Sequence, residues 1–224
     1  MTTTWLVSPL RFLSKRIAKD PSILALHNLE RGRAGLAATA TYAEISFGSA
    51  SWGARAVTLI AMLAGDPATA ETYLRLEYGS LYEMGERRFL ASTAAELARA
   101  IAAQGPSRYD EAVQLLDMSR EAAADEDLSP QAVGQGLYAR ILADRGRYRE
   151  AEELARSAAA LSAQTDLLSE HANTLLELSH VLAADGQVSE AHSVAAEALA
   201  LYQRKGNLPG ARESLRYLTQ SAPT

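Results

Sequence analysis

The stretch "GRYREA", residues 146–151, and the stretch "GQVSEA", residues 186–191, carry the same pattern forty residues apart. In each of them, an alanine follows the glycine five positions later. The segments before and after have apolar residues at steps of three and four, which is the spacing of a helix with one buried face. Glycine readily adopts the left-handed backbone conformation in which many helices end. The sequence therefore predicts pairs of helices joined by a glycine turn.

Two earlier copies extend this pattern towards the N-terminus. They are "LAGDPATAE", residues 63–71, and "IAAQGPSRYDEA", residues 101–112. Successive glycines, Gly65, Gly105, Gly146 and Gly186, are 40, 41 and 40 residues apart. The matching alanines are Ala70, Ala112, Ala151 and Ala191. A fixed period of this size is typical of stacked helical hairpins, because one hairpin cannot bury its apolar face alone.

Helix starts are marked by an oxygen-bearing side chain followed by proline, as at Asp66-Pro67 and Ser129-Pro130. The first residue caps the helix, and proline suits the first helical position. We expect a single repeat domain over residues 1–224. It is expected to contain N-terminal helices at 9–31, helix pairs at about 33–64, 67–104, 107–145, 148–185 and 188–205, and a C-terminal capping helix at 209–220.

The composition favours an all-α fold, since 44 of the 224 residues are alanine, the best helix former. The absence of cysteine excludes disulfides, zinc ribbons and thiol nucleophiles, and it suits a cytoplasmic location. The net charge of -5 argues against nucleic acid as a partner, because phosphate binding needs a basic surface. No stretch has the ~18 apolar residues that a membrane-spanning helix requires.

The repeat resembles the tetratricopeptide repeat (TPR) family, whose G-x-Y-x-E-A pattern is matched by "GRYREA" and by "YDEA", residues 109–112. That family has a second small residue seven positions after the alanine. Ser119, Ala158 and Ala198 fit this pattern, whereas Glu77 departs from it. The resemblance implies an all-α, TPR-like helical-hairpin solenoid with a right-handed superhelix, which binds a protein or peptide partner.

Three stretches support a narrower resemblance: "LAGDPATAETYLR" from residue 63, "MGERRFLASTAAELA" from residue 84 and "ALALYQRKGN" from residue 198. They are similar to the C-terminal TPR region of actinobacterial-type multidomain cyclase/ATPase signalling proteins and of related transcriptional activators. This resemblance implies a regulatory module of a bacterial signalling or transcription-regulating system. Its partners would include domains of its own parent assembly.

In TPR arrays the first helix of each hairpin lines a concave groove, so polar residues on these helices are binding candidates. Aligning the turn glycines places Arg99, Arg140 and His180 in one column. Further candidates for the groove surface come from the positions three and seven residues before each of these three. The partner-binding candidates are Ser92, Glu96, Arg99, Val133, Arg140, Asn173, Glu177 and His180. In a binding surface, these arginines could each hold a carboxylate of the partner through two hydrogen bonds. The alternative is that Glu96–Arg99 and Glu177–His180 are only ion pairs within one helix, which stabilise it by a few tenths of a kcal/mol.

The motifs that could indicate catalysis or cofactor binding occur without the neighbouring strand or the further ligands that such sites need. "GQGLYA", residues 134–139, formally matches the dinucleotide fingerprint, but it begins inside a helix opened by Pro130 and no strand precedes it. Glu177 and His180 could ligate a metal, but a di-iron bundle needs a second such pair. We therefore expect no cofactor, no metal and no enzymatic activity. An enzyme on this scaffold would have to depend on Glu177 or His180.

Several alternatives stay open. The leading hypothesis is a non-catalytic scaffold for protein interaction, and the alternative is a module that senses a small effector.

The basic first helix, with Leu10, Leu13 and Ile17 on one side, either packs on the next helix or rests on a membrane. A homodimer through a solenoid end is a further alternative, because the capping helix offers few large apolar anchors. These anchors are Leu208, Leu215, Tyr217 and Leu218.

Overall fold

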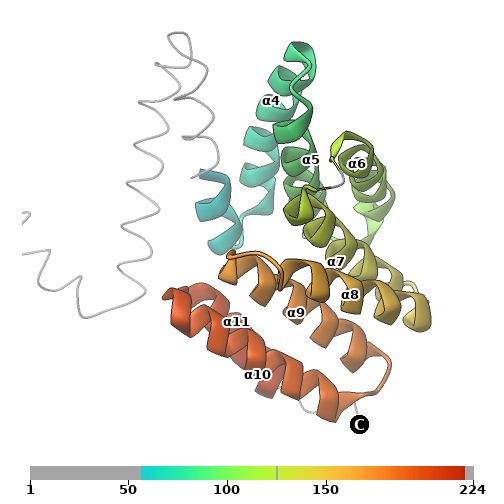
Figure 1. Ribbon diagram of the computed structural model, residues 1–224, viewed down its shortest axis with the longest axis vertical. Helices are drawn as coiled ribbons and strands as arrows, with labels where there is room; N and C mark the ends of the chain where they lie inside the picture. The colour runs from blue at the N-terminus through green and yellow to red at the C-terminus, as the bar shows by residue number, and fades with distance from the viewer. Residues whose placement is uncertain (1–56, 125, 220–224) are drawn as a thin grey trace, which may run out of the picture. The chain divides into compact units, whose positions relative to one another are not determined.

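The structure is a computed structural model that describes residues 57–124 and 126–219 (Figure 1). Within these two ranges the regular elements are helices, and no strand occurs. The chain divides into two compact units, Met1–Tyr73 and Leu74–Thr224. The expected helices at 9–31, most of the expected pair at 33–64 and the last residue of the expected cap lie outside the described residues.

The described part of the first unit contains a predicted helix start. Residues 57–63 are helical, and a turn at Gly65 leads into α4 (Pro67–Met84), which continues into the second unit. The Asp66 carboxylate accepts hydrogen bonds from the Thr69 backbone N–H at 3.1 Å and from its hydroxyl at 2.7 Å. The predicted cap at Asp66-Pro67 is confirmed.

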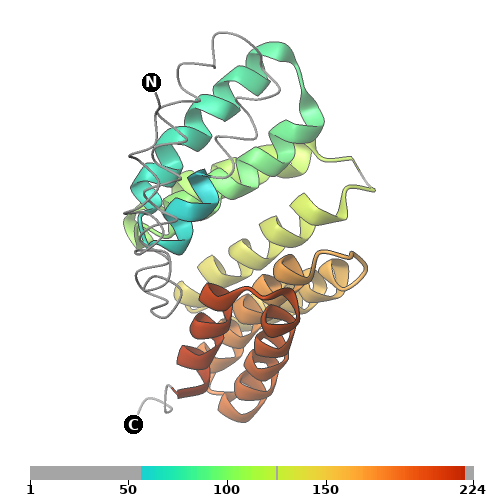
Figure 2. The ribbon, with the colours of Figure 1, turned by 90° about the vertical axis from the view of Figure 1, so that its left-hand side faces the viewer.

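The second unit consists of antiparallel helical hairpins, which follow one another in Figures 1 and 2. Its helices after α4 are α5 (Arg87–Ala102), the short 3-10 helix η1 (Pro106–Arg108), α6 (Tyr109–Ala122), α7 (Leu128–Asp144), α8 (Tyr148–Ser162), α9 (Leu168–Ala184), α10 (Val188–Lys205) and α11 (Leu208–Thr219). The closest packing joins α5 to α6, α7 to α8, and α9 to α10. The first helices of the hairpins also contact one another, since α7 packs against both α5 and α9.

The hairpins differ from the predicted grouping of helices. The predicted pairs at 107–145 and 148–185 each combine the second helix of one hairpin with the first helix of the next. Residues 188–205 form the single helix α10 rather than a pair. At Gly146 and Gly186 the short turn brings the two helices beside it together, so that α7 packs on α8 and α9 packs on α10.

The glycine turns at Gly146 and Gly186 have the predicted backbone conformation, whereas Gly105 has φ 124° and ψ 168°. Gly146 has φ 78° and Gly186 has φ 82°, both in the left-handed region. After the first of these, the Arg147 N–H donates to the Leu142 carbonyl at 2.9 Å, and the Gln187 N–H makes the equivalent bond at 2.8 Å. The turns therefore satisfy carbonyls that the end of each helix leaves free. None of the described helices is long and apolar enough to cross a membrane.

Two helix starts differ from the sequence prediction. Helix α7 begins at Leu128, before the predicted Ser129-Pro130 start. The Ser129 hydroxyl instead bonds Glu170 of α9 at 2.7 Å, so it links two first helices rather than capping one. At α11 the cap is Asn207, whose side-chain oxygen accepts the Gly210 N–H at 3.0 Å. Both differences arise because a polar side chain near a helix start can bond to several partners.

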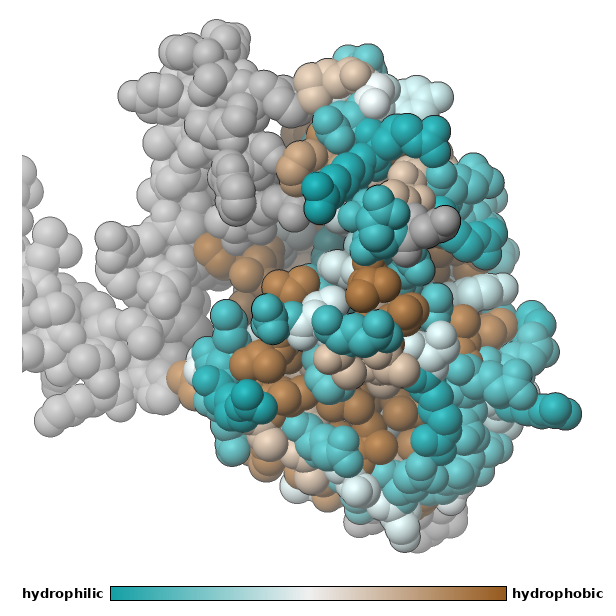
Figure 3. Space-filling model, viewed as in Figure 1, coloured by the Kyte–Doolittle hydropathy of each residue, from teal (hydrophilic) through white to brown (hydrophobic). Residues whose placement is uncertain are grey.

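The predicted alanine column lies in the core. Ala70, Ala112, Ala151 and Ala191 are buried, as are Ala158 and Ala198. Ser119 is buried as well, and its hydroxyl donates to the Ala91 carbonyl at 2.7 Å across the hairpin. Glu77, which departs from the small-residue pattern, is also buried. Apolar residues also reach the face shown in Figure 3, in the lower half of the view where α8, α9 and α10 lie.

We expect Ala151→Leu to lower the free energy of unfolding by about 1–3 kcal/mol, because the added methylene and methyl groups overpack a fully buried site. Urea unfolding followed by circular dichroism measures this loss. Ala160→Leu on the same helix is the matched control, since Ala160 is exposed. An equal loss in both variants would show that the column is not closely packed.

Candidate partner-binding surface

The predicted binding residues lie on three successive first helices, α5, α7 and α9. These residues differ in their exposure and in the contacts that they make. Val133 is only 4% exposed, so it belongs to the core and a partner cannot reach it. Ser92 lines a separate shallow depression together with Asp127, Ser129 and Thr165. The remaining candidates form or adjoin a set of polar contacts between helices.

Arg140 and Glu177 form a contact between α7 and α9. Arg140 Nη1 lies 3.4 Å from Glu177 Oε2, and the glutamate side chain is mostly buried. The neighbouring Glu177 carboxylate raises the pKa of Arg140, and this effect outweighs burial, which acts in the opposite direction. Glu177 is therefore bound to α7, the first helix of the preceding hairpin, rather than to His180 on its own helix.

His180 joins a second contact between the same two helices. Its Nε2 lies 2.8 Å from Asp144 Oδ1, and the Tyr109 hydroxyl donates to Asp144 Oδ2 at 2.5 Å. Burial would raise the pKa of Asp144, but the hydrogen bonds from Tyr109 and His180 lower it overall. Asp144 was not among the residues predicted from the sequence. Its spacing could have indicated it, since Asp144 lies one helical turn after Arg140 on the same helix face.

Asn173 is held by the second helix of its own hairpin. The Tyr202 hydroxyl of α10 donates a hydrogen bond to Asn173 Oδ1. Burial of the tyrosine raises its pKa, which keeps the phenol protonated and able to donate. Asn173, Arg140, Glu177 and His180 thus have partners within the protein, and their side chains are held in place.

Arg99 is the exception on this surface. Its nearest ionic partner is Glu96 on the same helix, with 4.0 Å between Nη1 and Oε2. Its Nε atom is buried and has no hydrogen-bond partner among the described residues. Burial alone would lower the pKa of Arg99, but the carboxylates of Glu96 and Glu177 raise it overall. Arg99 is therefore a charged group whose donors are not fully used.

The described residues do not bring a metal-binding set together. Within residues 57–124 and 126–219, no group of three or more His, Asp or Glu side chains could hold a metal ion. Glu177 and His180, the suggested ligand pair, contact different residues. The stretch "GQGLYA" lies inside helix α7, so its backbone amides do not form a phosphate-binding loop.

Comparison with known proteins bears on the fold. No protein-family model matches the sequence, and a search of curated proteins found no match. Among solved structures, the chain is similar to BtubC (BKLC) from P. vanneervenii, with a TM-score of 0.56 and 18% identity over 92% of this chain and 81% of that chain. This structural similarity, together with the repeated hairpins, confirms the predicted all-α architecture. The fold is a TPR-like helical repeat.

Two structures of a kinesin light chain protein from Podosopora anserina with nearly identical TPR-like repeats are also similar. One of them, a variant with a single substitution, has a TM-score of 0.49 and 21% identity, covering 78% of this chain and 85% of that chain. The other structure has a TM-score of 0.45 and 21% identity, covering 72% of this chain and 90% of that chain. At these identities, similarity concerns the fold and not the partner.

Proposed function

We propose that this TPR-like repeat is a non-catalytic scaffold that binds a protein or peptide partner through α5, α7 and α9. Arg99 is the proposed anchor for a carboxylate of the partner. The observation that carries this proposal is the buried Nε atom of Arg99, which has no hydrogen-bond partner in the described part of the chain.

An unpaired buried donor costs about 1–3 kcal/mol. The Arg99 side chain as a whole is 22% exposed, so a partner's carboxylate would bind the exposed part of the guanidinium and would reach Nε only after a small rotation of the side chain. A carboxylate suits the site best, because a guanidinium can bind both of its oxygens at once. The contacts of Arg140 with Glu177 and of His180 with Asp144 hold the adjoining surface in one arrangement. Less side-chain freedom is then lost on binding.

The narrower proposal is a cytoplasmic regulatory module of a bacterial signalling or transcription-regulating system. It is supported by the resemblance of the stretches beginning at residues 63, 84 and 198 to the TPR region of multidomain signalling proteins. Under this proposal the partner is a domain of the same assembly. The proposal also includes self-association through α11, because Leu208 and Leu215 are exposed on that terminal helix.

The test is to select binders of the full chain from a random peptide library and to measure their affinities for variants. Arg99→Ala is expected to weaken carboxylate-bearing peptides about 30-fold, the loss for a hot spot worth about 2 kcal/mol. Arg99→Lys should recover only part of this, since lysine cannot bind both oxygens. Affinity should also fall as salt is added.

Arg149→Ala is the matched control, because Arg149 is a highly exposed arginine on the second helix α8. Melting temperatures of all variants show whether folding is retained. Selected peptides that bind Arg99→Ala and the parent protein equally well would contradict the role of Arg99. A site for a small effector would instead show as a raised melting temperature with metabolites and no peptide binding.

A further inference from the structure

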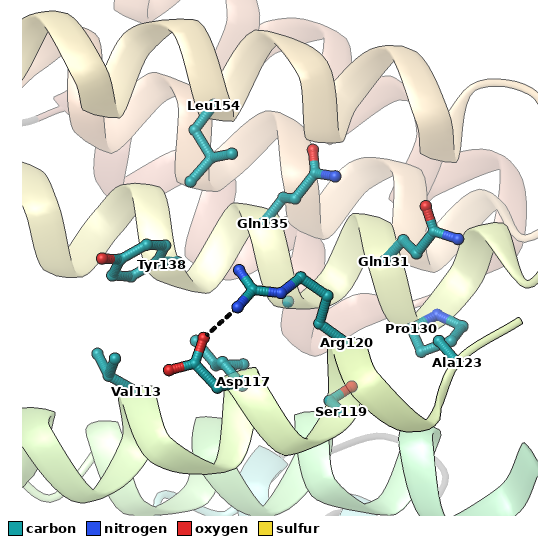
Figure 4. A pocket seen from close by; sticks show the side chains of 12 residues that line it. Val113, Asp117, Ser119, Arg120, Ala123, Pro130, Gln131, Gln135, Tyr138 and Leu154 are labelled. Atoms are coloured by element: carbon teal, nitrogen blue, oxygen red, sulfur yellow. Dashed lines mark hydrogen bonds and ion pairs between the residues drawn. The ribbon is translucent and has the colours of Figure 1, made fainter. Parts of the chain in front are cut away.

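A cavity of about 370 Å³ lies where α6 and α8 flank α7 (Figure 4), and neither Arg140 nor His180 is among the residues that line it. Its apolar lining consists of Val113, Leu116, Pro130, Tyr138 and Leu154. Gly134, Gln135 and Tyr138 of the "GQGLYA" stretch also line it. The residues that resemble a nucleotide fingerprint thus form part of a cavity wall and do not offer backbone amides in a loop.

Gly134 gives the cavity part of its depth. A Cβ atom built on Gly134 would meet only Leu116 Cδ2, at 3.7 Å, so no packing contact requires a glycine there. Glycine inside a helix is less stable than alanine. By contrast, a Cβ atom on Gly136 would meet Glu177 and Thr174 of α9 at 3.6 Å, on another side of the same helix. Alanine substitutions at Gly134 and Gly136 therefore form a matched pair of variants, because only the first adds a methyl group at the cavity.

Gln135 brings a polar atom that has no partner. Its Oε1 is buried and accepts no hydrogen bond from any residue that the structure describes. A buried acceptor left in this state is unfavourable. Rotation of the Gln135 side chain towards the cavity would let a ligand that supplies a donor satisfy it. The side-chain amide carries an acceptor and a donor side by side, which is the complement of the N–H and C=O of a peptide group.

The charges at the cavity indicate a neutral ligand. Asp117 and Arg120 of α6 lie 2.8 Å apart and neutralise each other, as the dashed line in Figure 4 shows. The volume lies at the lower end of the ~300–1,000 Å³ typical of ligand pockets. It leaves room for one large apolar side chain together with its own peptide group.

We propose that this cavity is a second peptide-binding site, which takes one neutral apolar side chain of a partner. Gln135 pairs with the peptide group that carries this side chain, and the apolar wall formed by Leu116, Tyr138 and Leu154 surrounds it. The site uses α6, α7 and α8, so it does not depend on Arg99 and extends the scaffold to a second surface.

N-acetyl-L-leucine amide and N-acetyl-L-phenylalanine amide serve as minimal probes of the full chain. Titration followed by protein amide NMR should give saturable shifts at residues 113–138. Gln135→Leu, which keeps the size of the side chain but removes its amide, should weaken binding about fivefold or more. Gly134→Ala should weaken it as well, whereas Gly136→Ala should not. Arg99→Ala should bind the probes like the parent protein, which separates this test from that of the first surface.

Three results would overturn the proposal. One is the absence of saturable shifts with either probe. Another is equal binding of N-acetyl-L-aspartate amide, which would show that the site does not select an apolar group. The third is binding of isoamyl alcohol that matches the amide probes and is insensitive to Gln135→Leu. That would make the cavity a site for small apolar molecules instead of peptides.

Discussion

Tyr202→Ala is expected to lower the free energy of unfolding by about 3–5 kcal/mol, the usual cost of removing a buried aromatic side chain. Tyr202 is only 2% exposed and is among the largest fully buried side chains of the described chain. Its ring joins three helices, because it belongs to α10, bonds Asn173 of α9 and lies against Gly210 of α11. Its loss should therefore also loosen the terminal helix. Urea unfolding followed by circular dichroism measures the change.

Two further variants separate packing from hydrogen bonding at this site. Tyr202→Phe keeps the ring and should cost about 1 kcal/mol, since only the bond to Asn173 is lost. Gly210→Ala would place a methyl group 2.5 Å from the Tyr202 ring. The expected overpacking cost of about 1–3 kcal/mol should outweigh the gain of about 1 kcal/mol in helix propensity. Tyr148→Ala, at a tyrosine that is 37% exposed, is the control; a loss there equal to that of Tyr202→Ala would contradict the argument.

The repeat could be predicted from the sequence because its signals are local. The positive φ of Gly146 follows from a requirement of the turn itself, and the burial of Ala151 follows from the close approach of two helices. Both signals recur at a fixed period, so neighbouring copies support one another. Helix starts were less predictable, because a residue such as Ser129 can bond either its own helix or the next one.

The contacts of the candidate surface could not be predicted, because they depend on how neighbouring helices are staggered. Aligning the turn glycines places Arg140 level with His180, forty residues later. The observed contacts join residues 37 positions apart, Arg140 with Glu177, and 36 positions apart, Asp144 with His180. The stagger is therefore about one helical turn. It sets each charged side chain beside a residue that lies about one turn away from the one that the alignment places level with it.

No repeated sequence pattern predicts the cavity beside α7. Gln135 is one polar residue in a helix, and its position in the sequence does not show that its oxygen is buried without a donor. This property arises only where α6, α7 and α8 meet. The same holds for Arg99, whose unused donors depend on the placement of the side chains around it.

Alkaline unfolding is the second large effect that we expect. Burial, together with a hydrogen bond to Asp144, raises the pKa of Tyr109 from 10.0 to about 12. Burial likewise raises the pKa of Tyr217 to about 12. A pKa that is higher in the folded state than in the unfolded state stabilises the fold fully below pH 10, and this contribution is lost as the pH rises through 12.

The size of the effect follows from the same shifts. Two pKa units correspond to at most about 3 kcal/mol for each group. For Tyr109 and Tyr217 together the loss is therefore at most about 6 kcal/mol, which reaches only the lower end of the ~5–15 kcal/mol by which a typical domain is stable. Burial of Tyr202 acts in the same direction. We expect helical circular dichroism to fall cooperatively between pH 10 and 12, together with the appearance of phenolate absorbance.

Tyr109→Phe distinguishes this mechanism from general base denaturation, because it should change stability in opposite directions at two pH values. Near neutral pH the variant should be about 1 kcal/mol less stable, since Asp144 loses a hydrogen bond. Above pH 10 it should unfold at a higher pH than the parent protein, because one buried phenol no longer has to ionise. Tyr148→Phe, at the half-exposed tyrosine, should leave the unfolding midpoint unchanged. If Tyr109→Phe lowered the alkaline midpoint, ionisation of this phenol would not be what unfolds the protein.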